Sequence, residues 1–222
     1  MACIKKRRIA VVLLLSLVAA LALSLTSCSC GIEYDEGEVL TAAEELIGRS
    51  ESLNSLLYGT GIRASAAESA KKYGAYIEAA QGDLTAYGVT SVSDIEKLIR
   101  ETYTKDYSAL LIKTKLSGMS SDGAGNFARY ISVTLTGDTD ATFMVYDGYP
   151  VMLRGTAVYD YGTLRITGTE RSRVIVSIYV LVSDGEGSQT KEISVGLRRE
   201  DNGWRLDDAT YASYTADYQL SD

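Results

Sequence analysis

The fold class of this chain is decided by its strongest strand signal, Arg173-Val174-Ile175-Val176-Ser177-Ile178-Tyr179-Val180-Leu181-Val182. Every second residue from Val174 to Val182 is valine or isoleucine. A period of two in β-branched residues is typical of a strand with one buried face. The other face carries Arg173, Ser177 and Tyr179 together with Ile175 and Leu181, so we expect it to be partly buried as well.

The same period of two recurs in other segments of the second half of the chain. Apolar and hydroxyl residues alternate over 131–136, and Ile193, Val195 and Leu197 follow a loop that carries Asp184-Gly185. Asn202-Gly203 then leads into Trp204-Arg205-Leu206-Asp207, and Asn-Gly between alternating runs is a strong hairpin signal. These segments predict an antiparallel sheet.

Apolar residues in the first half of the chain recur instead at three and four. Residues 38–58 carry one such stripe, which predicts an amphipathic helix that ends at Gly59 and Gly61. Residues 64–80 are rich in Ala, Lys and Glu, which favours a helical continuation, although Gly74 and nearby tyrosines interrupt it.

Two further helices are predicted from capping residues. Ser93 followed by Glu96 reads as a capping box, and Thr104 can cap a helix over Lys105 to Leu116 that Gly118 stops. Helices that precede strands predict an α+β fold, with N-terminal helices packed on a curved C-terminal antiparallel sheet. No Pro-rich or Ser-rich linker divides the chain, so residues 38–210 are expected to form one domain, followed by a Tyr-rich tail over 211–222.

The N-terminus reads as a cleaved export signal over residues 1–27. Lys5-Lys6-Arg7-Arg8 precedes an apolar run of 17 residues from Ile9 to Leu25, interrupted by two serines. An uncleaved membrane anchor is the first alternative, but a spanning helix needs roughly 20 apolar residues. An ordinary secretory signal, with the cysteine present by chance, is the second.

The four residues Leu25-Thr26-Ser27-Cys28 resemble the lipobox of bacterial lipoproteins at all four positions. This resemblance implies acylation of Cys28, so a covalent lipid such as palmitate is the expected modification and no other cofactor is expected. It also implies attachment to the extracytoplasmic face of the cell membrane. Cys30 lacks the apolar residue three places earlier and is interpreted as part of an acidic tether over 28–37, which cannot reach further than about 30 Å.

Charge and residue absences exclude several functional classes. Cleavage removes four basic residues and no acidic one, which changes the formal net charge from −7 to −11 and disfavours nucleic acid as a partner. The chain has no histidine, and outside the leader only Cys28 and Cys30 carry thiols. Ser-His-Asp and Cys-His catalysis, His-ligated metals and cysteine metal sites in the domain are therefore excluded.

Three local patterns resemble ligand-binding motifs, but the residues in and around them favour turns. Residues 59–64, Gly-Thr-Gly-Ile-Arg-Ala, match a loose dinucleotide fingerprint, but a helix precedes them, so a helix C-cap and turn is favoured. Residues 138–140 begin like a calcium loop but lack its Gly and Glu, and residues 122–126 are also interpreted as a turn.

The chain contains 16 tyrosines and only 2 phenylalanines. This ratio is compatible with a sugar-contacting or peptide-contacting surface and also with partly exposed strands, which we favour. Tyr159-Asp160-Tyr161 and the tail residues Tyr211, Tyr214 and Tyr218 are least explained by strands; the tail spacing fits a short helix. Tyr179, with Ser177 and Arg198 behind it, is the candidate ligand pocket.

The element order, with Asn-Gly-Trp-Arg-Leu-Asp-Asp at 202–208 and Glu-Thr-Tyr-Thr-Lys-Asp-Tyr at 101–107, resembles the nuclear-transport-factor-two-like superfamily, with its cone-shaped SnoaL-like or cystatin-like domain. It is similar to uncharacterised bacterial lipoproteins that carry this domain. The resemblance implies a concave sheet and helices that enclose a pocket. A cystatin-like or lipocalin-related lipoprotein fold is the alternative.

Three functions remain open at this point. The first is a surface-tethered, non-catalytic binding or assembly module, with an unidentified small ligand or envelope protein as its partner. The second is an acid/base enzyme that uses a buried carboxylate beside a tyrosine. The third is a structural envelope protein that acts through oligomers and exposes an apolar patch on its sheet.

Overall fold

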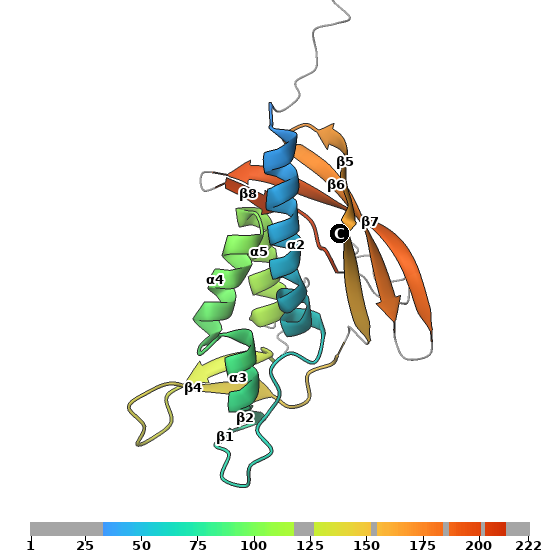
Figure 1. The fold of residues 1–222 in the computed structure, drawn as a ribbon. Helices are drawn as coiled ribbons and strands as arrows, with labels where there is room; N and C mark the ends of the chain where they lie inside the picture. The colour runs from blue at the N-terminus through green and yellow to red at the C-terminus, as the bar shows by residue number, and fades with distance from the viewer. Residues whose placement is uncertain (1–32, 118–126, 152–154, 184–186, 201–202, 212–222) are drawn as a thin grey trace, which may run out of the picture. The chain divides into compact units, whose positions relative to one another are not determined.

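The computed structural model describes residues 33–117, 127–151, 155–183, 187–200 and 203–211 (Figure 1). Contacts divide the chain into residues 1–32 and 33–222, and all described residues belong to the second unit. No helix in the described part is long and apolar enough to cross a membrane. The predictions made for the leader, Cys28, Cys30, Gly118, residues 122–126, the Asp184-Gly185 loop, Tyr214 and Tyr218 lie outside the described residues.

Helix α2, Glu36–Tyr58, is the central element of the described unit. It begins two residues before the predicted start, because the Asp35 side chain accepts a hydrogen bond of 2.8 Å from the Glu38 N–H and caps it. Gly59 ends it, as predicted. The predicted apolar stripe is buried and packs against strands of the C-terminal sheet, which lies beside α2 in Figure 1.

The helix predicted over residues 64–80 is wrong. This segment forms β1, Lys72–Tyr73, and β2, Tyr76–Glu78, as a hairpin whose turn holds Gly74 at φ +59°. A φ of this sign is incompatible with an α-helix. In the sheet the Tyr76 side chain is buried, and its hydroxyl donates a hydrogen bond of 2.9 Å to the Ala128 carbonyl. Tertiary pairing therefore overrides the local preference for helix.

Three helices follow, α3 at Gln81–Tyr87, α4 at Val92–Thr102 and α5 at Lys105–Leu111. A capping box does start α4, but it joins Ser91 to Asp94 and not Ser93 to Glu96. The helix begins two residues earlier than predicted, which places Asp94 at its third position. Helix α5 continues as the π-helix η1, Ile112–Leu116, so the predicted range is confirmed.

Two four-stranded antiparallel sheets form instead of the single predicted sheet. In the first, of order β1-β2-β4-β3, strands β3, Tyr130–Val133, and β4, Thr142–Tyr146, pair with the unexpected hairpin. The second has the order β5-β6-β7-β8 and contains β5, Thr156–Glu170, β6, Arg173–Ser183, β7, Ser188–Glu200, and β8, Gly203–Leu206. The α+β class is confirmed, and so is the antiparallel pairing of β7 with β8.

The strongest strand signal becomes β6, in the interior of the second sheet. Its valine and isoleucine face is fully buried from Val174 to Val182. The opposite face is buried only at Ser177, whereas Tyr179 and Leu181 are 37% and 43% exposed. The predicted partial burial of both faces is therefore correct near Ser177 and ends before Tyr179.

Candidate functional site

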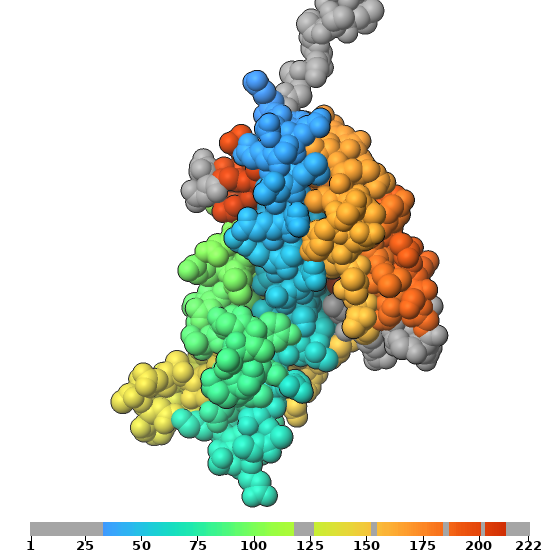
Figure 2. Space-filling view, in the orientation of Figure 1, coloured from blue at the N-terminus to red at the C-terminus, as the bar shows by residue number. Residues whose placement is uncertain are grey.

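A cleft of about 480 Å³ lies between the second half of α2 and the start of β5, which adjoin on the surface in Figure 2. Its size falls in the range of small-molecule sites, roughly 300–1,000 Å³. Helix α2, the segment before β5, β5 itself and the C-terminal segment contribute its lining residues: Glu51, Asn54, Ser55, Gly59, Thr60, Val151, Gly155, Thr156, Ala157, Tyr159 and Tyr211.

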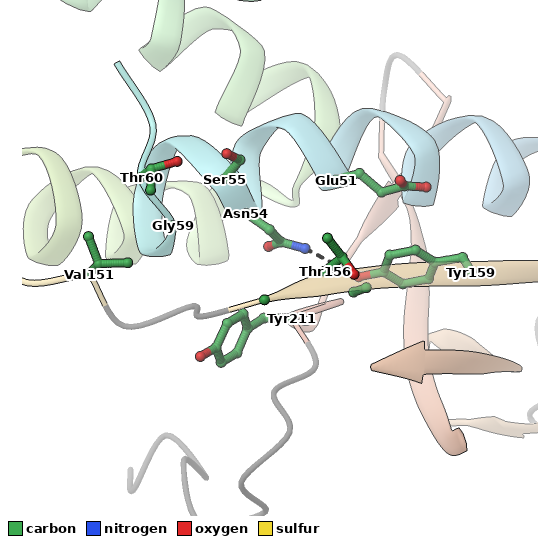
Figure 3. Close-up of a pocket in the computed structure, with 11 residues that line it drawn as sticks. Glu51, Asn54, Ser55, Gly59, Thr60, Val151, Thr156, Tyr159 and Tyr211 are labelled. Atoms are coloured by element: carbon green, nitrogen blue, oxygen red, sulfur yellow. Dashed lines mark hydrogen bonds between the residues drawn. The ribbon is translucent and has the colours of Figure 1, made fainter. Parts of the chain in front are cut away.

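The helical repeat brings the polar lining residues of α2 together. Glu51, Asn54 and Ser55 are three and four residues apart and therefore share one face of the helix. Figure 3 shows Asn54 pointing from α2 toward β5, where Thr156 and Tyr159 lie, whereas the Ser55 hydroxyl points away from the strand. The two walls of the cleft are thus a helix face and the start of a strand.

Beneath the lining of the cleft lies a buried hydrogen-bond network, here called its floor, that joins the lining residues Asn54 and Tyr159 to Ser50 and Thr210, which do not themselves line the cleft. The Tyr159 hydroxyl donates to the Thr210 carbonyl at 2.8 Å, and the Asn54 amide donates to the Thr210 hydroxyl at 3.0 Å. The Ser50 and Thr210 hydroxyl oxygens are 2.5 Å apart. Burial raises the pKa of Tyr159 to about 12. Because these groups hydrogen-bond one another, the floor is ordered before any ligand arrives.

The charged group of the cleft, the Glu51 carboxylate, lies at its mouth. Glu51 is exposed, and of the described residues that line the cleft it is the only charged one. The Tyr161 hydroxyl donates to Glu51 Oε1 at 2.6 Å, and burial together with this bond raises the pKa of Tyr161. The neighbouring Ser55 hydroxyl lies 2.6 Å from that of Tyr87.

Aromatic rings form the opposite end of the cleft. Tyr211 stacks on the buried Tyr58 with ring centroids 4.8 Å apart. Burial raises the pKa of Tyr58 to about 12, and the Lys115 ammonium lies 5.1 Å from the centre of its ring. Burial lowers the pKa of Lys115. Tyr211, predicted as part of a tail helix, is instead a ring in the cleft wall.

Arg129 supports this end from behind. Its guanidinium is buried, and Nη2 donates to the carbonyls of Gly59 and Thr60 at 2.6 Å each. The two carbonyls follow the C-terminal end of α2, where a positive charge is favoured by the helix dipole. The interpretation of residues 59–64 as a helix C-cap and turn is confirmed. No sequence pattern indicated that Arg129 holds this turn.

The three predicted pocket residues do not line this cleft. Tyr179 and Ser177 lie on the outer face of the β5–β8 sheet, where the Ser177 hydroxyl is 2.8 Å from that of Ser194 and the Arg165 guanidinium is 5.4 Å from the centre of the Tyr179 ring. Arg198 lies in a separate hollow with Glu170, Arg171, Ser172 and Arg173. The structure does not gather the three around one cavity, and ligand binding by them stays a prediction.

Arg198 is one of three arginines that form a row across adjacent strands, and aspartates form ion pairs with two of them. Arg173, Arg198 and Arg205 are register partners on adjacent strands, an arrangement that like charges disfavour. Asp207 lies 2.7 Å from Arg198, and Asp208 lies 3.1 Å from Arg173. The closing Trp-Arg-Leu-Asp-Asp segment therefore has a structural role: its two aspartates offset the charge of the row.

Sequence analysis missed Glu51, Asn54 and Thr210 as site residues. One signal was available, because Ser50 and Asn54, four residues apart, interrupt the otherwise apolar stripe of α2. Buried polar residues on a helix need partners from another element. Thr210 follows the last strand and carried no such signal.

None of the Asp or Glu residues that the structure describes is buried, and the described residues contain no group of three His, Cys, Asp or Glu residues that could hold a metal ion. The fold and the site together define an α+β domain with a polar, aromatic surface cleft. No protein-family model matches the chain, and no curated protein matches it significantly.

Proposed function

We propose that this chain is an exported lipoprotein, held at the extracytoplasmic face of the cell membrane by a lipid on Cys28, whose domain binds a small organic ligand without catalysis. The observation that carries the binding role is the α2–β5 cleft, with its ordered floor at Asn54, Tyr159 and Thr210 and its open mouth at Glu51. Preformed polar groups that converge on a cavity are the usual features of a ligand site. The nuclear-transport-factor-two-like resemblance stays a prediction.

The acid/base alternative requires a buried carboxylate beside a tyrosine. Glu51 accepts a hydrogen bond from Tyr161, but Glu51 is exposed at the mouth. The low-polarity surroundings that prepare a carboxyl group for general acid/base work are therefore missing at this pair. This favours the binding role over the enzymatic one.

The lipid anchor is tested by labelling cells with radioactive palmitate. The wild-type protein and the Cys30→Ser control are expected to incorporate the label and to fractionate with the envelope. The Cys28→Ser protein is expected to do neither. Label on Cys28→Ser, or its retention in the envelope, would contradict the anchor.

The binding role is tested with the full lipidated chain in detergent and a panel of small amines, polyols and carboxylates. We expect at least one compound to raise the Tm of the wild type and not that of Ala157→Trp, which fills the cleft. Val158→Trp is the matched control, because the adjacent Val158 is exposed on the outer face of the sheet. Equal shifts in both variants, or no shift with any compound, would reject the cleft. Turnover of a panel compound that Ala157→Trp abolishes would favour the enzyme instead.

The outer face of the β5–β8 sheet supports a second candidate, assembly through oligomers. Val158 and Leu181 are register partners, and they and Tyr179 are exposed by 59%, 43% and 37%. A structural envelope protein that acts through oligomers would require an exposed apolar patch of this kind. Self-association in sedimentation that Leu181→Asp abolishes would support it, and a wild-type monomer at all concentrations would remove it.

A further inference from the structure

We infer that the ligand of the α2–β5 cleft carries a positive charge, held as an organic ammonium group by the Glu51 carboxylate. This inference rests on the proposed binding function and narrows its ligand class. It is carried by the charge of the lining, by the free acceptor capacity of Glu51 and by the aromatic ring of Tyr159.

The described lining residues carry negative charge and no positive charge. Of these eleven residues only Glu51 is charged, and the other ten are neutral polar, small or aromatic residues. An anionic ligand would meet a carboxylate without a compensating cation. A cationic ligand would meet a carboxylate and, with the leader removed, a protein of net charge −11, which raises the local concentration of cations.

Glu51 retains capacity to bind such a cation. A carboxylate can accept about four hydrogen bonds, and the structure shows one, from the Tyr161 hydroxyl to Oε1. Among the described residues no ion pair involves Glu51. The neighbouring Glu45, by contrast, pairs with Arg49 one turn along the helix. Within the described ranges, the carboxylate at the mouth therefore has no counterion from the protein itself.

The two cations near the aromatic end contact other groups, although Nε and Nη1 of the buried Arg129 have no hydrogen-bond partner among the described residues. Arg129 is buried and directs Nη2 at the carbonyls of Gly59 and Thr60, and Lys115 lies over the Tyr58 ring. Neither lines the cleft. Their positive charges therefore do not occupy the place of a ligand cation beside Glu51.

The remaining lining also suits an ammonium group. Tyr159 presents an aromatic ring on the Glu51 side of the cleft (Figure 3), and a cation within about 6 Å of a tyrosine ring is attracted by its quadrupole. The Thr156 hydroxyl offers an acceptor for ammonium N–H groups. One carboxylate with an aromatic ring is a common arrangement for organic cations.

The experiment compares choline and n-butylammonium with 3,3-dimethylbutan-1-ol, the neutral isostere of choline, by calorimetry on the full lipidated chain at low ionic strength. We expect both cations to bind at least about ten times more tightly than the isostere. Glu51→Gln preserves the shape and an acceptor for Tyr161, and should weaken cation binding at least fivefold while leaving the isostere unchanged. Glu36→Gln is the matched control, because Glu36 is an exposed glutamate in the first turn of the same helix, outside the cleft, and should change neither.

Each outcome separates this inference from the proposed function. If the isostere binds as tightly as choline and Glu51→Gln changes neither, the cleft binds ligands without a charge requirement and only the inference fails. The inference is also overturned if neither cation binds. It is overturned too if the cations bind Ala157→Trp as tightly as the wild type. If no compound of the wider panel binds the cleft, the proposed function fails with it. Circular dichroism of each variant verifies its fold.

Discussion

Gly61 lies where the chain leaves α2 and where Arg129 and Tyr130 contact the turn. Its φ of +52° is in the left-handed region, and a Cβ there would stand 2.2 Å from the Tyr130 hydroxyl oxygen. That hydroxyl donates to the Leu56 carbonyl at 3.0 Å and accepts from the Ile62 N–H at 3.1 Å. Only glycine satisfies both the backbone angle and the close approach.

The first prediction separates these two requirements. Gly61→Ala is expected to destabilise the protein by about 3 kcal/mol, because it adds left-handed strain and displaces the Tyr130 hydroxyl from its two partners. Gly74→Ala is the matched control: its φ is +59°, but nothing lies within 4 Å of the new Cβ, so only strain of about 1 kcal/mol is expected. Urea unfolding measures both. Equal losses would mean that the contact with Tyr130 contributes nothing.

At the scale of elements, the sequence predicts well where local signals and tertiary contacts agree. Helix α2 and strand β6 follow their apolar periods, because the same side chains that set the period form the core. The β1–β2 hairpin was not predicted. Its strand β2 pairs with β4, which is more than 60 residues away in the chain, so the hairpin depends on a contact that a local pattern does not encode. Strand β5 was missed as well; its exposed side chains leave little alternation to detect.

The second prediction concerns the cap of α4, which lies two residues before the position predicted from the sequence. The Asp94 carboxylate accepts from the N–H groups of Thr90 and Ser91 at 2.8 and 2.9 Å, and these bonds hold its pKa below the ordinary value. Asp94→Ala should therefore cost about 1 kcal/mol in the free energy of unfolding. Glu96→Ala, at the partner position of the rejected capping box, should cost less than about 0.5 kcal/mol.

The pH dependence gives this prediction a second readout. A carboxyl group with a depressed folded-state pKa stabilises the protein above its unfolded pKa, and this contribution is lost as the pH falls through the folded value. The cost of Asp94→Ala, measured by urea unfolding, should thus shrink as the pH falls below about 4. A constant cost from pH 7 to pH 3 would contradict the role of the charged carboxylate.

At the scale of the whole molecule, the cleft is assembled from residues far apart in the sequence. Asn54, Tyr159 and Thr210 belong to a helix, a strand and the segment after the last strand, and 156 residues separate the first from the last. No local period encodes such a meeting. The sequence did single out Tyr159 and Tyr211 as tyrosines unexplained by strands, and both are in the cleft wall. The polar network beneath them was beyond sequence analysis because it depends on the packing of α2 against β5.

The last prediction uses the buried tyrosines of the whole unit. Burial raises the pKa values of Tyr58, Tyr130 and Tyr159 to about 12 and those of Tyr103 and Tyr107 further. An unfolded tyrosine ionises near 10. Because the folded pKa values lie above the unfolded one, the unfolded state binds fewer protons in this range, and stability is expected to fall as the pH rises from about 10 toward 12.

The measurement follows tyrosinate absorbance at 295 nm together with far-UV circular dichroism during alkaline titration. We expect some of the tyrosines to ionise near pH 10 with no change in the dichroism, and the rest to ionise in a second, steeper step that coincides with unfolding. In concentrated urea all should titrate in one step near 10. A single smooth step in the folded protein, with the dichroism intact, would mean that the tyrosine cluster around α2 and the cleft is open to solvent.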